Sequence, residues 1–105
     1  MYLVHVGLRR PRRTTELPAE IGELVLSRAL PRERIEHISV HPHARPHPVL
    51  GVYLLADRLE EAEAHAEQAC RRAIARCPQL AWWELVDAQV PLLDARVTSS
   101  AGSLD

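Results

Sequence analysis

Apolar residues recur with two different periods along this chain, and the changes of period divide it into six segments. Residues 1–8 (MYLVHVGL) are rich in aromatic and β-branched residues and end at a basic, proline-containing stretch, which predicts a β-strand. Residues 16–30 (ELPAEIGELVLSRAL) place apolar side chains at helical spacing from Leu17 to Ala29, after two threonines that could cap a helix. We therefore expect a helix over this second segment that ends at Pro31.

Two further strands are predicted in the middle of the chain, on either side of a segment rich in histidine and proline. Residues 34–41 (RIEHISVH) alternate with a period of two, so that Ile38 and Val40 share one face and polar residues share the other. Residues 49–56 (VLGVYLLA) form a second apolar run. We expect these two strands to pair as a hairpin.

A second helix is predicted after the hairpin. Asp57, followed three residues later by Glu60, matches a capping box, and apolar residues then form a continuous stripe from Leu59 to Cys77. The stripe is mostly alanine, so this helix can lie close to a sheet before it stops at Pro78.

The last apolar segment, residues 82–90 (WWELVDAQV), predicts a fourth strand. The order strand, helix, strand, strand, helix, strand is the ferredoxin-like arrangement, an α+β fold in which two helices cover one face of a four-stranded antiparallel sheet. We assign residues 1–93 to one such domain. Residues 94–105 are small and polar, and we expect them to form a flexible C-terminal tail.

Composition limits the classes of function but selects none. The chain has 105 residues, enough for one modest core, and its net charge of -1 gives no overall attraction to nucleic acid or to acidic lipid. All thirteen basic residues are arginine, and lysine, phenylalanine and asparagine are absent, which we interpret as the codon bias of a GC-rich bacterial genome. The sequence shows no signal-peptide pattern and no apolar run long enough to cross a bilayer, so we expect a cytoplasmic protein.

The spacing of the two cysteines also favours a cytoplasmic protein. Cys70 and Cys77 lie seven positions apart on the predicted helix, which places their Cα atoms about 10 Å apart. That distance exceeds the reach of a disulfide. We therefore expect two buried or half-buried free thiols in a reducing environment.

The helices of this fold leave one face of the sheet open, and the residues predicted there mix apolar and polar side chains. The candidates for lining a ligand pocket are His5, His37, His41, Tyr53 and Glu84. The candidates for a dimer interface are Leu3, Val49, Leu55, Trp82 and Val86. So apolar a face predicts a homodimer that forms sheet against sheet, and such an interface can enclose a small-molecule pocket.

The turn between the hairpin strands contains three histidines with the spacing H-x-H-x3-H. Neutral imidazole is a common ligand of divalent metals, so His41, His43 and His47 are candidate ligands. The prolines between them restrict how the three rings can meet, and no cysteine or carboxylate lies within the turn. We favour a stiff turn with solvated histidines, and no cofactor, over a metal site.

Two other patterns bear on function. The stretch RRPRR at residues 9–13 could hold phosphate groups, but the predicted third strand has one tyrosine and no basic residue, unlike an RNA-recognition sheet, so nucleic acid is not the favoured partner. Ser39 lies between His37 and His41, and neighbours two apart on a strand are separated by about 7 Å. We therefore expect Ser39 to lie too far from either imidazole to be activated.

Three functions are compatible with these patterns. We favour a small dimeric binding or accessory protein that recognises a protein or small ligand through the open sheet face. The first alternative is an enzyme without a cofactor, with His5, His37 or His41 as general base and Tyr53 as an orienting donor. The second is a metal-binding or metal-sensing protein that uses the turn at residues 41–47.

Overall fold

The computed structural model describes residues 1–91 and confirms the ferredoxin-like α+β topology. Its main elements are β1 (Tyr2–Arg9), α1 (Ile21–Ser27), β2 (Ile35–His41), β3 (Val49–Leu54), α2 (Leu59–Arg76) and β4 (Glu84–Gln89). Two short 3-10 turns, η1 (Pro31–Glu33) and η2 (Pro78–Leu80), precede β2 and β4. The proposed domain end at residue 93 and the predicted tail, residues 94–105, lie outside the described residues.

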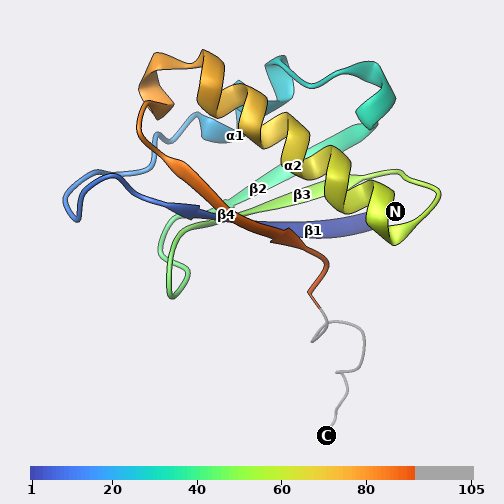
Figure 1. Ribbon diagram of the computed structural model, residues 1–105, viewed down its shortest axis with the longest axis horizontal. Coiled ribbons are helices and arrows are strands. Elements are labelled where there is room, and N and C mark those ends of the chain that lie inside the picture. Colours follow the sequence, from blue (N-terminus) through green and yellow to red (C-terminus); the bar gives the residue numbers. More distant parts are fainter. Residues whose placement is uncertain (92–105) are drawn as a thin grey trace, which may run out of the picture.

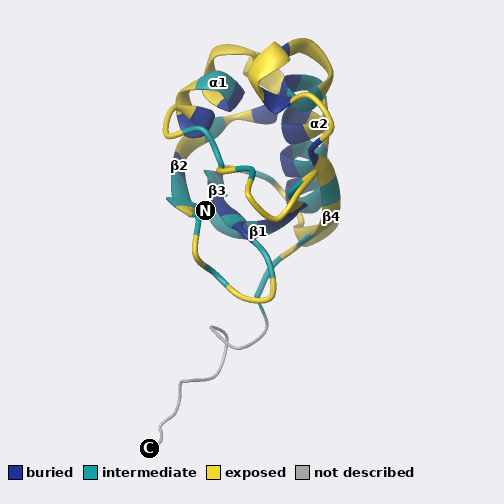
Figure 2. Cartoon of the chain, turned by 90° about the vertical axis from the view of Figure 1, so that its left-hand side faces the viewer, coloured by how far each residue is buried: buried dark blue, intermediate teal, exposed yellow. Residues whose placement is uncertain are grey.

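The four strands form one antiparallel sheet in the order β2-β3-β1-β4, so β1 and β3 are central. α1 packs over β2, and α2 crosses over β1 and β4 on the same face (Figure 1). The buried residues are concentrated between this helix layer and the sheet (Figure 2). Within residues 1–91, no helix covers the opposite face of the sheet, and none is long and apolar enough to cross a bilayer.

Alternation along the strands determines which side chains enter the core. In β1, Val4, Val6 and Leu8 are buried under the helices, and the residues between them belong to the open face. In β2 and β3, Ile38 and Val52 face each other across the pair and are likewise buried. The predicted parity of these three strands is therefore confirmed.

The alanine stripe of α2 allows the helix to lie close to the sheet. Ala62, Ala66, Ala69 and Ala73 are completely buried, and a methyl group keeps the helix backbone near the strands. Cys70 is buried in the same stripe, and burial, together with the charge of Glu33, raises the pKa of its thiol to about 12. Cys70 and Cys77 are both free and buried, as predicted.

Local predictions at both helices were wrong. α1 begins at Ile21 rather than residue 16, because Pro18 disfavours helical backbone in the residue before it, and it ends at Ser27 rather than at Pro31. The N-cap of α2 is Arg58, not Asp57. Glu61, not Glu60, accepts a hydrogen bond from the Asp57 amide at 2.8 Å.

The start of the last strand also differs from the prediction. β4 begins at Glu84, because Pro78 opens the η2 turn and Trp82 adopts a left-handed backbone conformation with φ of 74°. Trp83 is buried in the core, whereas the Trp82 side chain is 84% exposed. Trp82 therefore lies before the sheet and not on its open face.

A buried ion pair connects the η1 turn to α2 within the helix layer. Glu33 in η1 is fully buried, and its two carboxylate oxygens accept hydrogen bonds from Arg72 of α2 at 3.0 and 2.7 Å. The amide of Leu30 donates to the same carboxylate at 2.9 Å. Burial raises the pKa of Glu33, but the Arg72 hydrogen bonds, the Leu30 hydrogen bond and the nearby guanidinium charges outweigh it, so that the pKa lies below its ordinary value.

We expect Glu33→Gln to lower the free energy of unfolding by about 3 kcal/mol, because it leaves Arg72 without its counter-charge. The pKa of Glu33 is lower in the folded than in the unfolded chain. Its stabilisation is therefore complete above about pH 4.3, the value of an unfolded glutamate, and decreases as the pH falls through the folded-state pKa. Urea unfolding at pH 7 and at acidic pH measures both effects.

The exposed pair between Glu67 and Arg71, at 2.8 Å, supplies the matched control for that experiment. Glu67→Gln should cost less than about 0.5 kcal/mol, because water already solvates both partners. Equal losses in the two variants would show that Glu33 and Arg72 do not form the central ion pair described above.

Candidate functional site

The open face of the sheet mixes imidazole, hydroxyl and carboxylate groups with a few apolar side chains. Strand alternation assigns to this face Leu3, His5, Gly7 and Arg9 of β1, His37, Ser39 and His41 of β2, Val49, Gly51 and Tyr53 of β3, and Glu84, Asp87 and Gln89 of β4. All five pocket candidates, His5, His37, His41, Tyr53 and Glu84, therefore belong to this face of the sheet.

Two glycines on the central strands allow neighbouring side chains to approach the backbone of this face closely. A Cβ atom at Gly51 would lie 2.5 Å from Ser39 Oγ and 3.3 Å from Leu3 Cδ1. A Cβ atom at Gly7 would overlap the ring of His47 and lie 2.7 Å from Asp87 Oδ1. Neighbouring side chains therefore lean over both glycines, and we call the region above Gly7 and Gly51 the glycine hollow.

At the β2 side of the glycine hollow, Ser39 and His41 interact directly. Ser39 Oγ and His41 Nε2 lie 3.0 Å apart, within hydrogen-bonding distance. The expectation that they lie too far apart was wrong, because the long imidazole leans along the strand into the space left by Gly51. His41 Nε2 would lie 3.8 Å from a Cβ atom at that glycine.

An aromatic pair lies next to these groups. His37 and Tyr53 face each other across β2 and β3, with ring centroids 5.5 Å apart and planes tilted by 41°. Leu3 pairs with Tyr53 from the other side, on β1. This end of the open face is therefore the more apolar one, and such cross-strand pairs also stabilise the sheet.

The opposite end of the glycine hollow is polar. A cavity of about 510 Å³ there is lined by residues that include His5, His47, Asp87 and Gln89. Nδ1 of His47 is buried and has no hydrogen-bond partner among residues 1–91. A buried polar atom without a partner is costly, and a bound molecule could supply the missing interaction.

The three histidines of the turn do not come together. His41 lies on β2 beside Ser39, His43 is exposed in the turn, and His47 lies over Gly7. Within residues 1–91, no group of three or more His, Cys, Asp or Glu side chains is placed to hold a metal ion. The described part of the chain therefore offers no ligand set for the metal alternative.

The remaining candidates lie at the edges of the open face or beyond it. Glu84 is on β4, where its carboxylate forms a 2.6 Å ion pair with Arg9. Leu55 follows the end of β3, and Val86 occupies the extra position of a β-bulge between β1 and β4; both are partly exposed. Of the five interface candidates, Leu3 and Val49 lie within the open face itself.

Sequence reasoning missed both glycines and the two polar residues of β4, Asp87 and Gln89. A signal was present for the glycines, since an isolated glycine in a strand pattern indicates close approach by other groups. No such signal exists for Asp87, because the bulge at Val86 shifts the register of β4.

Comparisons of this chain with protein-family models, with curated proteins and with solved structures gave no match.

We expect Gly51→Ala to destabilise the chain by about 1–3 kcal/mol, because the new methyl group displaces Ser39 and Leu3. Gly22→Ala is the matched control: its Cβ atom would meet Val40 Cγ2 at 3.6 Å, an ordinary contact, on a helix where alanine is favoured. It should be neutral or stabilising. Urea unfolding compares the two variants, and equal effects would contradict the close packing over Gly51.

Proposed function

We propose that this chain is a ligand-binding protein whose binding surface is the open face of the sheet, covered by a second copy of the chain. The observation that carries the proposal is the cavity of about 510 Å³ at the Gly7 end of the glycine hollow, which His5, His47, Asp87 and Gln89 line with polar groups. The buried, unpartnered Nδ1 of His47 supports this interpretation, since an occupied site would satisfy it.

The groups around the glycine hollow suit a small organic molecule with both polar and apolar parts. The donors and acceptors around the hollow are imidazoles, hydroxyls, one carboxylate and one amide. The apolar margin of the hollow comes from Leu3 and Val49. Binding sites for small molecules usually combine apolar walls with a few placed polar groups. A protein partner at this face is the alternative occupant.

A second copy of the chain is the favoured cover for the open face. Stacked sheets pack about 10 Å apart, so two hollows that face each other would be enclosed between the layers. The half-buried Leu3, Val49 and Tyr53 supply apolar contact near the centre of the face. An isologous dimer uses the same patch twice and is the commonest form of oligomer.

Native mass spectrometry at neutral pH tests this proposal, on untagged protein purified without a nickel column. We expect a dimer, and we expect Val49→Arg to be monomeric because it places a charge in the centre of the interface. Leu26→Arg is the control, since Leu26 is 37% exposed on α1, in the helix layer, and its variant should stay dimeric.

The same spectra report bound mass. An organic adduct that is lost in a Gly7→Val variant, which places a side chain at the wall of the cavity, would support the ligand-binding function. A wild-type chain that is monomeric at tens of micromolar would contradict the covered face, and a stoichiometric metal would favour the metal alternative instead.

One observation favours an enzyme as the second candidate function. The 3.0 Å approach of Ser39 Oγ to His41 Nε2 is the geometry of a nucleophile beside its general base. A fluorophosphonate probe tests it: Ser39 Oγ would bond to phosphorus, fluoride would leave, and His41 would take the hydroxyl proton. Stoichiometric labelling of Ser39 that is lost in His41→Gln would support acyl-transfer chemistry, and no labelling would exclude it.

A further inference from the structure

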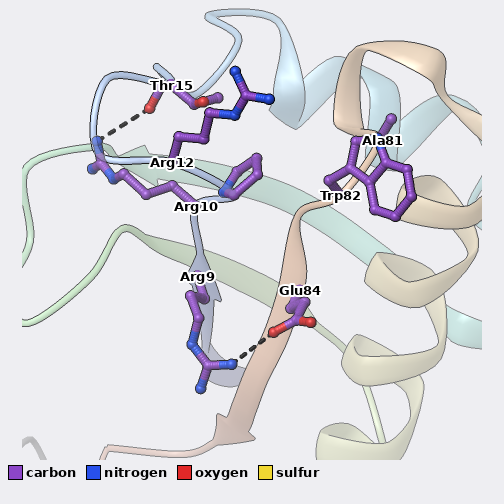
Figure 3. A pocket seen from close by; sticks show the side chains of 8 residues that line it. Arg9, Arg10, Arg12, Thr15, Ala81, Trp82 and Glu84 are labelled. Atoms are coloured by element: carbon purple, nitrogen blue, oxygen red, sulfur yellow. Dashed lines mark hydrogen bonds and ion pairs between the residues drawn. The ribbon is translucent and has the colours of Figure 1, made fainter.

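A second surface, separate from the glycine hollow, lies where β1 ends and β4 begins. Trp82 is 84% exposed, the highest value among the large apolar side chains of residues 1–91. Opposite it is the basic stretch at residues 9–13, and a hollow of about 570 Å³ separates the two. We call it the arginine–tryptophan hollow (Figure 3).

The backbone holds the Trp82 ring in the solvent. Trp82 adopts φ of 74°, a conformation that a bulky residue rarely occupies and that costs free energy. The residues around it fix the turn, because the Trp83 amide donates to the carbonyl of Leu80 at 3.1 Å and the Trp83 ring is buried in the core. The exposed indole is therefore presented on a short, anchored turn.

The arginines on the other side have different roles. Arg9 is already neutralised by Glu84, at 2.6 Å, and Arg10 donates to the carbonyl of Thr15 at 3.3 Å, which braces the loop. Arg12 extends from this loop toward the hollow, on the side opposite Trp82 (Figure 3). Among residues 1–91, neither Arg10 nor Arg12 forms an ion pair with a carboxylate.

These groups suit a ligand that carries both a phosphate group and a planar ring. A guanidinium binds phosphate oxygens through paired, charge-assisted hydrogen bonds, and an exposed indole offers a flat surface on which a planar ring can stack. Glu84 is the one carboxylate among the described residues that line the hollow, and Arg9 pairs with it. The remaining charge is positive and favours an anion.

We propose that the arginine–tryptophan hollow binds a nucleoside phosphate, with the base stacked on Trp82 and the phosphate held by Arg12. One exposed aromatic ring accommodates one base, whereas a single-stranded nucleic acid needs successive stacking platforms along a basic track. Within residues 1–91, Trp83 is buried and both tyrosines are partly covered, so they do not extend the platform. This site is independent of the glycine hollow and of dimer formation.

Isothermal titration calorimetry of the untagged chain tests the proposal with four probes: ADP, adenosine, inorganic phosphate and a ten-nucleotide single-stranded DNA. We expect saturable binding of ADP, weaker binding of adenosine and of phosphate, and a decrease in ADP affinity as salt is raised. Quenching of tryptophan fluorescence by ADP gives an independent readout, because Trp82 is the exposed indole and Trp83 is buried.

Three variants assign the binding to this hollow. Trp82→Gly removes the ring and relieves the left-handed backbone strain, so the variant should fold at least as stably while ADP affinity falls about tenfold or more. Arg12→Gln should also weaken ADP binding about tenfold and reduce its salt dependence. Arg58→Gln is the control, because this exposed arginine at the start of α2 does not line the hollow.

Several outcomes would overturn the proposal. Absence of ADP binding at millimolar concentration, or binding that none of the variants changes, would do so directly. Phosphate that binds as tightly as ADP and is unaffected by Trp82→Gly would indicate a simple anion site. Tighter binding of the DNA strand than of ADP would indicate a nucleic-acid surface.

Discussion

The ion pair between Glu33 and Arg72 is the interaction on which the arrangement of the helix layer depends. Arg72 donates to both oxygens of a carboxylate that is fully buried, and it also donates to the backbone carbonyl of Arg28, just after α1. One guanidinium thereby ties the end of α1, the η1 turn and α2 together. Because the Glu33 carboxylate is fully buried, loss of Arg72 leaves an uncompensated charge, and this cost fixes α1, η1 and α2 relative to one another.

A helix layer confined to one face leaves the other face available, and two glycines determine its shape. At Gly7 and Gly51 neighbouring side chains occupy the position where a Cβ atom would be, so the polar groups of this face lie close to the backbone of the central strands. The ion pair between Arg9 and Glu84 lies at the end of this face and also lines the arginine–tryptophan hollow. The two proposed surfaces are thus neighbours on the molecule with different chemistry: imidazoles and hydroxyls in one, guanidinium groups and an indole in the other.

The fold was predictable because its signals are local and repeated. Strand parity, the alanine stripe and the proline that follows α2 each depend on a few consecutive residues, and together they specify one topology. The errors arose where a neighbour competes with the local pattern: Pro18 delays the start of α1, and the η2 turn removes Trp82 from β4. The approach of Ser39 to His41 was missed because Cα spacing along a strand does not describe how far a long side chain leans.

The sequence by itself determined the ferredoxin-like order, the core-facing residues of the first three strands, the two buried thiols and the presence of histidines on an open face. These features follow from periodicity and spacing, which are properties of short segments of the sequence. Only the tertiary structure decided that His47 lies over Gly7 beside Asp87, that Ser39 meets His41 above Gly51, and that Trp82 and arginines of the first loop line one hollow. Except for Ser39 and His41, each of these contacts joins residues that are remote in the chain, so pairing register, the β-bulge and helix packing had to be established before they could form.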